Sequence, residues 1–77
     1  MPTVFEEKGY RFFFYSNEHL PVHIHVRHAG GEAIFEIENI VELRGSQKMK
    51  VKELAIALKL IEEHKKLILE KWNEHIS

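Results

Sequence analysis

Hydrophobic and polar residues alternate through the first part of the chain and then adopt a helical spacing. From residue 1 to about residue 44, apolar side chains tend to recur at every second position, which is typical of strands with one buried face. From residue 51 to residue 76 they follow helical spacing, and this segment contains neither glycine nor proline. Because the strands precede the helix instead of alternating with it, the pattern predicts an α+β fold.

The expected architecture is a small antiparallel β-meander of three to four strands, followed by a C-terminal helix packed on one face of the sheet. Lys8-Gly9 favours a tight turn between the first two strands. The segment SNEHLP, residues 16–21, has the composition of a connecting loop. The segment RGSQKMK, residues 44–50, is polar and predicts a flexible connection. Because the helical pattern is interrupted at residues 64–66, we expect a kink or a break near His64.

Residues 22–38 have the pattern of a β-hairpin. Successive side chains of a strand point to opposite faces, so VHIHVRH separates into an apolar and a polar set. The apolar set is Val22, Ile24 and Val26, and the polar set is His23, His25 and Arg27. Gly30-Gly31 fits a two-residue turn that needs positive φ angles. Counting outward from this turn pairs His25 with Glu36. The same register pairs His23 with Glu38 and matches apolar residues on the opposite face.

The preceding strand contributes one of two alternative sets of side chains to the polar face of this hairpin. One set is Arg11, Phe13 and Tyr15, and the other is Tyr10, Phe12 and Phe14. We favour the first set, because it leaves Phe12 and Phe14 for the core.

Composition limits the chain to one small domain. A chain of 77 residues, 44 % of them hydrophobic, can build one core, so we assign residues 1–77 to a single domain. Residues 1–44 form its β-meander and residues 51–76 its helical segment. The absence of cysteine excludes disulfides and thiolate zinc sites, which leaves histidine ligands or self-association as further sources of stability.

Charge and hydropathy limit the kinds of binding partner and the cellular location that we expect. The net charge of −1 and the pI near 6.6 disfavour binding to duplex DNA, whereas RNA could bind a local patch. The sequence shows neither an export leader nor an apolar run of ~20 residues, so we expect no membrane association and a cytoplasmic location.

A metal site is one interpretation of the clustered histidines. His23 and His25 lie two positions apart on a strand and could share one ion. His19, Glu36 or Glu38 could complete the ligands of zinc, nickel or manganese. The spacing alone is weak evidence, because any exposed strand offers such pairs. We therefore favour no cofactor, and a divalent transition metal stays an open alternative.

Acid–base catalysis is a second interpretation. A histidine beside a carboxylate is held in one orientation and suits proton transfer near neutral pH, so His23 and His25 are candidate catalytic residues. Tyr15 could stack on a base or donate a proton, and Phe13 could stack as well. Together these groups suit a metal-independent endoribonuclease.

Binding without catalysis is a third interpretation. Arg11 and Arg27 could contact phosphate, while Phe13, Tyr15 and Ile34 form an apolar cluster of the kind that marks an interaction surface. Homodimerisation or a protein partner would then use the same face. From spacing alone, the His–Glu pairs are more simply explained as surface pairs worth ~0.2–1 kcal/mol each.

The remaining histidines are expected to have structural roles. We expect His28 to cap the hairpin turn, and His64 and His75 to be solvated helix residues, with His75 complementing the helix dipole. Leu60 and Leu67 lie off the expected core stripe of the helical segment, so they either extend the core or form a second contact surface for another subunit. That stripe consists of Leu54, Leu58, Ile61, Ile68 and Trp72.

Several segments of the chain resemble one known family. They are MPTV at the start, GYRFFFYSNE at 9–18, PVHIHV at 21–26, GEAIFEI at 31–37, KEL at 52–54 and LEKWNE at 69–74. These segments are similar to the short prokaryotic proteins grouped as domain of unknown function 4160. Members of that family are often encoded beside a small partner gene and have been proposed as toxin–antitoxin components. The resemblance therefore implies a small cognate protein as a partner.

The resemblance also bears on individual residues. The positions that match the family pattern are Arg11, Tyr15, Ser16, Asn17, His23 and His25. Pro21-Val22 stands where the family tends to have a proline doublet, and Glu36 stands where it tends to have an aromatic residue. The resemblance therefore does not support Glu36 as a shared catalytic group.

Taken together, these observations predict a toxin–antitoxin type protein that binds RNA through the exposed sheet face, and that cleaves it if the chain is an enzyme. The alternative is a non-catalytic module that dimerises, or holds a partner or a metal ion, through the same face. The candidate catalytic residues are His23, His25 and Tyr15. The candidate binding residues are Arg11, Arg27, Phe13, Ser16, Asn17, Glu36 and Glu38.

Overall fold

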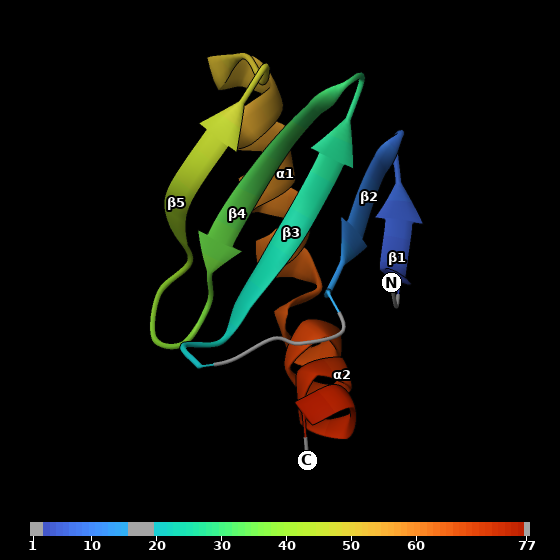
Figure 1. The fold of residues 1–77 in the computed structure, drawn as a ribbon, viewed down its shortest axis with the longest axis vertical. Coiled ribbons are helices and arrows are strands. Elements are labelled where there is room, and N and C mark those ends of the chain that lie inside the picture. The colour runs from blue at the N-terminus through green and yellow to red at the C-terminus, as the bar shows by residue number, and fades with distance from the viewer. Residues whose placement is uncertain (1–2, 16–19, 77) are drawn as a thin grey trace.

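The chain forms one antiparallel sheet followed by two helices (Figure 1). The computed structural model describes residues 3–15 and 20–76. The strands are β1 (Thr3–Glu7), β2 (Tyr10–Phe13), β3 (His23–His28), β4 (Gly31–Glu36) and β5 (Glu42–Gln47), and each pairs antiparallel with the next. The helices are α1 (Val51–Glu63) and α2 (Lys65–Ile76). The predicted α+β class is confirmed, but the described residues form five strands instead of three or four.

The strand missing from the sequence-based prediction is β5. Most of the predicted flexible connection, residues 44–50, belongs to it. All six β5 residues are exposed, so the strand has no buried face and its sequence lacks the alternation that reveals a strand. Its pairing with β4 depends on backbone hydrogen bonds, which require no particular pattern of side chains. The pairing shifts between Ile34 and Phe35, where β5 contains a bulge.

The helical segment breaks at His64, as the interruption of its pattern predicted, so it forms two helices instead of one. His64 leaves the helical conformation with φ −113° and ψ 18°, and its backbone N–H donates to the carbonyls of Leu60 and Ile61. The imidazole stacks on Phe5 of β1 at 4.2 Å, and its Nε2 lies 3.4 Å from the carboxylate of Glu7. The break thus coincides with a contact between the helices and the sheet edge.

The core lies between the helices and one face of the sheet; Figure 1 shows α1 behind the strands and α2 continuing below them. Its strand residues are the even-numbered apolar positions of β2 and β3 and the odd-numbered ones of β4, so the predicted division into faces is correct. Leu60 is buried at 2 % exposure, although it lies off the predicted stripe. The principal core residues are Phe12, Phe14, Ile24, Val26, Phe35, Ile37, Ala57, Leu60, Ile61, Ile68 and Trp72.

The turn between β3 and β4 differs from the prediction by one residue. The two turn residues are Ala29 and Gly30, with φ angles of 47° and 82°, and not Gly30-Gly31. Gly31 begins β4, and glycine is required there for another reason: a Cβ would overlap the carbonyl oxygen of Lys48. Moving the turn by one residue shifts the register by two, so every side chain keeps its face but changes its partner.

The other histidines connect elements instead of lying in solvent. The Nδ1 of His28 donates to the carbonyl of Gly9 in the first hairpin at 3.0 Å, and its ring stacks on Tyr10 at 3.8 Å. The Nε2 of His75 donates to the carbonyl of Tyr15 at 3.0 Å. The expected turn cap at His28 and the expected solvation of His64 and His75 are therefore wrong, because each ring is half-buried against a neighbouring element.

Within the described ranges, neither helix is long and apolar enough to cross a membrane.

Candidate functional site

The open face of the sheet is the face that the helices leave uncovered, turned toward the viewer in Figure 1. Strand parity places on it the residues that the sequence grouped together, with two additions from β5. Phe13 of β2 pairs with His25 of β3, which pairs with Ile34 of β4, which pairs with Gly45 of β5. The open face consists of Arg11, Phe13, Tyr15, His23, His25, Arg27, Glu32, Ile34, Glu36, Gly45 and Gln47.

An aromatic cluster occupies the middle of the open face. The ring of His25 stacks on Phe13 at 5.5 Å and meets Tyr15 edge-on at 4.4 Å and His23 edge-on at 5.3 Å, measured between ring centroids. The structure thus brings together the three predicted catalytic residues. Their catalytic roles stay predictions.

Burial limits what this cluster can do. His25 is 6 % exposed and Phe13 is 0 % exposed. The guanidinium of Arg27 lies 5.4 Å above the Phe13 ring, while Tyr15 meets its edge at 5.3 Å. The prediction that Phe13 stacks on a base therefore does not fit the structure, because neighbouring side chains cover its ring. Tyr15 is half-buried and keeps accessible surface.

Glu32 joins the aromatic cluster to the charged part of the open face. One carboxylate oxygen accepts a hydrogen bond from the Tyr15 hydroxyl at 3.3 Å and lies 4.0 Å from Nδ1 of His25. The other oxygen accepts a hydrogen bond from the Arg27 guanidinium at 3.2 Å. The carboxylate beside the histidine is therefore Glu32, which the predicted site omitted.

The predicted carboxylate partners lie elsewhere. Glu36 pairs with His23 on β3, and its carboxylate accepts hydrogen bonds from Arg44 at 3.0 and 3.2 Å. Glu38 is exposed beyond the end of β4. The predicted pairs His25–Glu36 and His23–Glu38 are wrong because the turn begins at Ala29, which makes Ile34 the partner of His25.

The two predicted phosphate-binding arginines lie directly opposite each other on neighbouring strands. Arg11 of β2 pairs with Arg27 of β3, and their side chains are 47 % and 46 % exposed. Arg11 lies 3.6 Å from the carboxylate of Glu6, and Arg27 contacts Glu32. Like charges at opposite positions oppose strand pairing. The two carboxylates offset part of that cost while leaving both guanidinium groups accessible.

His23 differs from His25 in where its ring lies. Its Nδ1 is 2.8 Å from the carbonyl oxygen of Pro21, and because a carbonyl can only accept, Nδ1 carries the proton in this contact. The ring also lies 5.3 Å from that of Trp72 in α2. We expected both imidazoles to face away from the helical segment. That expectation is wrong for His23, because α2 extends past the lower end of the sheet (Figure 1).

Three of the predicted site residues, Ser16, Asn17 and His19, lie outside the described residues. In the described part of the chain, no group of three or more His, Asp or Glu side chains is arranged to hold a metal ion. His23 and His25 are adjacent, and their contacts include aromatic rings, the carbonyl of Pro21 and, for His25, the carboxylate of Glu32 at 4.0 Å. A divalent metal therefore stays an untested alternative.

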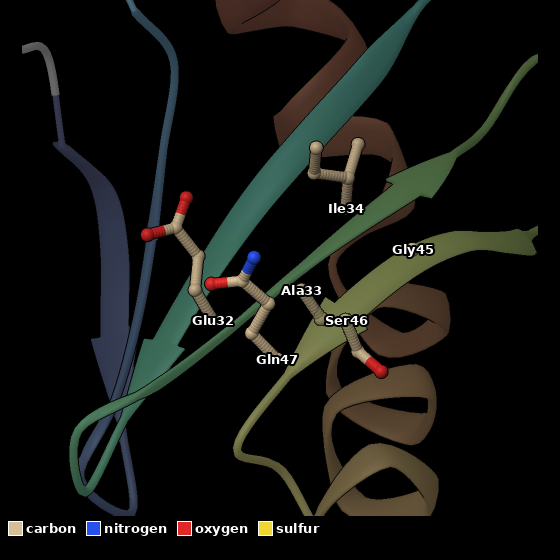
Figure 2. Close-up of a pocket in the computed structure, with 6 residues that line it drawn as sticks. All are labelled: Glu32, Ala33, Ile34, Gly45, Ser46 and Gln47. Atoms are coloured by element: carbon tan, nitrogen blue, oxygen red, sulfur yellow. The ribbon is translucent and has the colours of Figure 1, made fainter.

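A hollow of about 410 Å³ adjoins the aromatic cluster on β4 and β5 (Figure 2). Figure 2 shows the carboxylate of Glu32 and the amide of Gln47 side by side at one end, with Ile34 farther along β4. Glycine at position 45 leaves space beside Ile34, since a Cβ there would meet no atom within 4 Å. The hollow is lined by Glu32, Ala33, Ile34, Gly45, Ser46 and Gln47.

Sequence reasoning missed Glu32, Gly45 and Gln47 for identifiable reasons. Strand alternation puts Glu32 on the same face as Glu36, but the incorrect register placed Glu36 beside His25. Gly45 and Gln47 belong to the strand that was predicted to be a connection. The signal that indicates the correct turn is Ala29-Gly30, because a residue with a small side chain followed by glycine can also form a two-residue turn with positive φ angles.

Comparison with known proteins gives one family match. The family model described as Domain of unknown function (DUF4160) matches residues 9–73, which include β2 to β5, α1 and most of α2. No curated protein and no solved structure matches the chain.

Proposed function

We propose that this chain, which belongs to the family described as Domain of unknown function (DUF4160), binds single-stranded RNA on its open face as a toxin–antitoxin type protein. The proposal is drawn from the geometry of that face. The observation that carries the proposal is the pair Arg11 and Arg27. Two half-exposed guanidinium groups at opposite strand positions can contact two successive phosphates of one RNA strand, which relieves their mutual repulsion.

Single-stranded RNA fits this surface better than duplex DNA. The whole chain has a net charge of −1, so attraction to nucleic acid has to come from the local arginine pair. Tyr15, half-buried beside the arginines, offers a ring edge and a hydroxyl to an unpaired base. A flat sheet face accepts splayed bases, whereas duplex DNA is usually read by an element inserted into a groove.

Cleavage is the less supported half of the proposal. His25 has little accessible surface, so contact with the substrate would fall to His23 and Tyr15, while His25 and Glu32 would position Tyr15. Binding without cleavage requires only the arginines and the surface around them. We therefore propose RNA binding as the primary activity.

A cognate protein is the second candidate ligand of the open face. Ile34 is half-exposed in its centre, and Gly45 leaves the adjacent surface open to a large apolar side chain. An antitoxin that covers this surface would compete with RNA for the same arginines.

Fluorescence anisotropy with a short labelled single-stranded RNA tests the proposal. With two phosphate contacts, log K should fall with log salt concentration with a slope of about −1.4, and Arg11→Ala or Arg27→Ala should each reduce that slope by about 0.7. Lys52→Ala and Lys59→Ala are the matched controls, because they remove the same charge from exposed positions on α1 behind the sheet. Equal losses in all four variants, or no binding by the wild type at low salt, would contradict the proposal.

The same variants distinguish binding from cleavage and test the toxin role. If expression of the wild type arrests growth, Arg11→Ala with Arg27→Ala should relieve the arrest. His23→Ala should abolish RNA cleavage while leaving affinity within a factor of about three if His23 is catalytic. Relief of growth arrest by the arginine variants without any RNA cleavage by the wild type would assign toxicity to binding alone.

A further inference from the structure

The hollow between β4 and β5 lies beside the proposed phosphate contacts but has no part in them. Glu32 connects the two regions, because its carboxylate holds Arg27 on one side and lines the hollow on the other. A nucleotide whose phosphate contacts Arg27 would therefore have its base within reach of β4 and β5. The volume of about 410 Å³ falls within the range of ~300–1,000 Å³ typical of small-molecule sites.

Glu32 and Gln47 provide a hydrogen-bonding pattern at one end of the hollow. They are paired residues of β4 and β5, and Figure 2 shows their polar groups side by side on the open face. A carboxylate offers about four lone-pair positions. Tyr15 and Arg27 use one on each oxygen. Nδ1 of His25 lies 4.0 Å from the oxygen that Tyr15 bonds, which is too far for a hydrogen bond, so one acceptor position on each oxygen is still available. The amide of Gln47 adds both a donor and an acceptor.

The Watson–Crick edge of guanine matches this pattern. It presents two neighbouring donors, N1–H and N2–H, beside one acceptor, O6. The two donors suit a carboxylate, and O6 suits the amide N–H of Gln47. Adenine, cytosine and uracil each lack this pair of adjacent donors, so they satisfy the carboxylate with at most one hydrogen bond.

Gly45 provides the second, independent observation. Glycine inside a strand weakens it, and it often marks a place where a ligand approaches the backbone closely. Gly45 adjoins the bulge of β5, but its φ is not positive and a Cβ would meet nothing within 4 Å, so neither backbone strain nor crowding requires glycine here. Gly31 is the contrast, since a Cβ there would overlap the Lys48 carbonyl. The missing side chain at position 45 keeps the hollow open beside the apolar surface of Ile34.

We infer that this hollow is a guanine subsite of the RNA-binding face, with Glu32 and Gln47 contacting the base edge and Ile34 lying beside the ring. The inference rests on the proposed function, because it extends the same face from phosphate binding to base recognition. It gives RNA binding a sequence preference that the arginines alone cannot supply.

The test compares short uridine-rich RNAs that carry one central guanosine, inosine, adenosine or uridine, with affinity measured by fluorescence anisotropy. The guanosine RNA should bind roughly tenfold more tightly than the adenosine and uridine RNAs, as expected for a bidentate base contact. Inosine lacks the N2 amino group, so the affinity of the inosine RNA should lie between that of the guanosine RNA and those of the adenosine and uridine RNAs.

Substitutions in the hollow test whether it is the source of the guanosine preference. Gly45→Val fills the hollow with a residue that favours strands, and it should reduce the affinity for guanosine RNA to that for uridine RNA. Gln47→Ala should remove most of the preference without filling the hollow, which keeps the test decisive if Gly45→Val folds poorly. Leu43→Val is the matched control on the same strand, because Leu43 is exposed and does not line the hollow, so the preference should survive.

The outcomes separate the subsite from the proposed function. Equal affinity for all four RNAs, or a guanosine preference that survives both Gly45→Val and Gln47→Ala, overturns the subsite and leaves RNA binding in place. No binding to any of the four RNAs overturns both. Arg27→Ala should weaken all four by a similar factor, since a phosphate contact does not discriminate between bases.

Discussion

The pKa of the Tyr10 hydroxyl depends on where the fold places this residue. Tyr10 is 3 % exposed, beneath the helices at the start of β2, and its ring stacks on His28. Burial raises the pKa of Tyr10 above its ordinary value of 10.0, and the negative charge of Glu53 raises this pKa further. The folded chain therefore holds the Tyr10 proton at a pH at which the unfolded chain releases it.

This difference predicts a loss of stability in alkali. Because the folded-state pKa is the higher one, the contribution of Tyr10 is complete below pH 10.0 and is lost as the pH rises through the folded-state pKa. Tyr10→Phe removes the ionising group, so its free energy of unfolding should fall less steeply above pH 10.0 than that of the wild type. Urea denaturation across this pH range measures both slopes. Parallel curves would show that Tyr10 does not contribute to the alkaline transition.

At the scale of elements, Glu53 ties the start of α1 to the sheet. Its Oε1 accepts a hydrogen bond from the backbone N–H of Lys50 at 2.8 Å, which satisfies one of the donors at the helix N-terminus. Its Oε2 lies 3.5 Å from Nε2 of His28 at the end of β3. One side chain therefore both caps the helix and connects it to the strand that carries the histidines.

Removing this cap should cost measurable stability. Glu53→Ala should lower the free energy of unfolding by about 1–2 kcal/mol, whereas Glu53→Gln should lose less because its amide oxygen can still accept from Lys50. Glu62→Ala, at an exposed position of the same helix, should stay within ~0.5 kcal/mol of the wild type. Urea denaturation at neutral pH makes the comparison. A Glu62→Ala loss equal to that of Glu53→Ala would point to helix propensity instead of capping.

At the scale of the whole molecule, Trp72 joins α2 to the sheet. It is 3 % exposed, meets Phe14 edge-on at 5.3 Å and lies against His23, so it contacts the sheet from both its core side and its end. The C-terminal helix thus supports the position of a histidine on the open face. The stability of the fold and the geometry of the candidate site share this contact.

Trp72→Ala should come close to unfolding the protein. Truncating a buried tryptophan costs about 3–5 kcal/mol, while a domain of 77 residues has a total stability on the order of 4–12 kcal/mol. Trp72→Phe retains most of the buried area and should cost clearly less. Thermal unfolding followed by far-ultraviolet circular dichroism ranks the three proteins. If Trp72→Ala melts at the wild-type temperature, α2 is not part of the cooperative fold.

The alternation of side chains determined which residues of the candidate site share a face. Arg11, His25 and Arg27 lie on the open face as predicted, because strand periodicity is a local property that survives the one-residue error in the turn. The order of strands before helices, the break at His64 and the family followed from the sequence in the same way.

Only the tertiary structure decided which residues of the candidate site contact each other and which of them are exposed. Glu32, and not Glu36, lies beside His25 because the register depends on the backbone conformation at Ala29. The strand β5 and its hollow form through backbone pairing, which leaves no hydrophobic alternation in the sequence. Phe13 and His25 are buried on a face without helices, where Tyr15 contacts both rings and Arg27 lies over that of Phe13. Periodicity along one strand specifies the face of the sheet to which each side chain points. The burial of that side chain and its partner on the next strand depend on residues that are distant in the sequence.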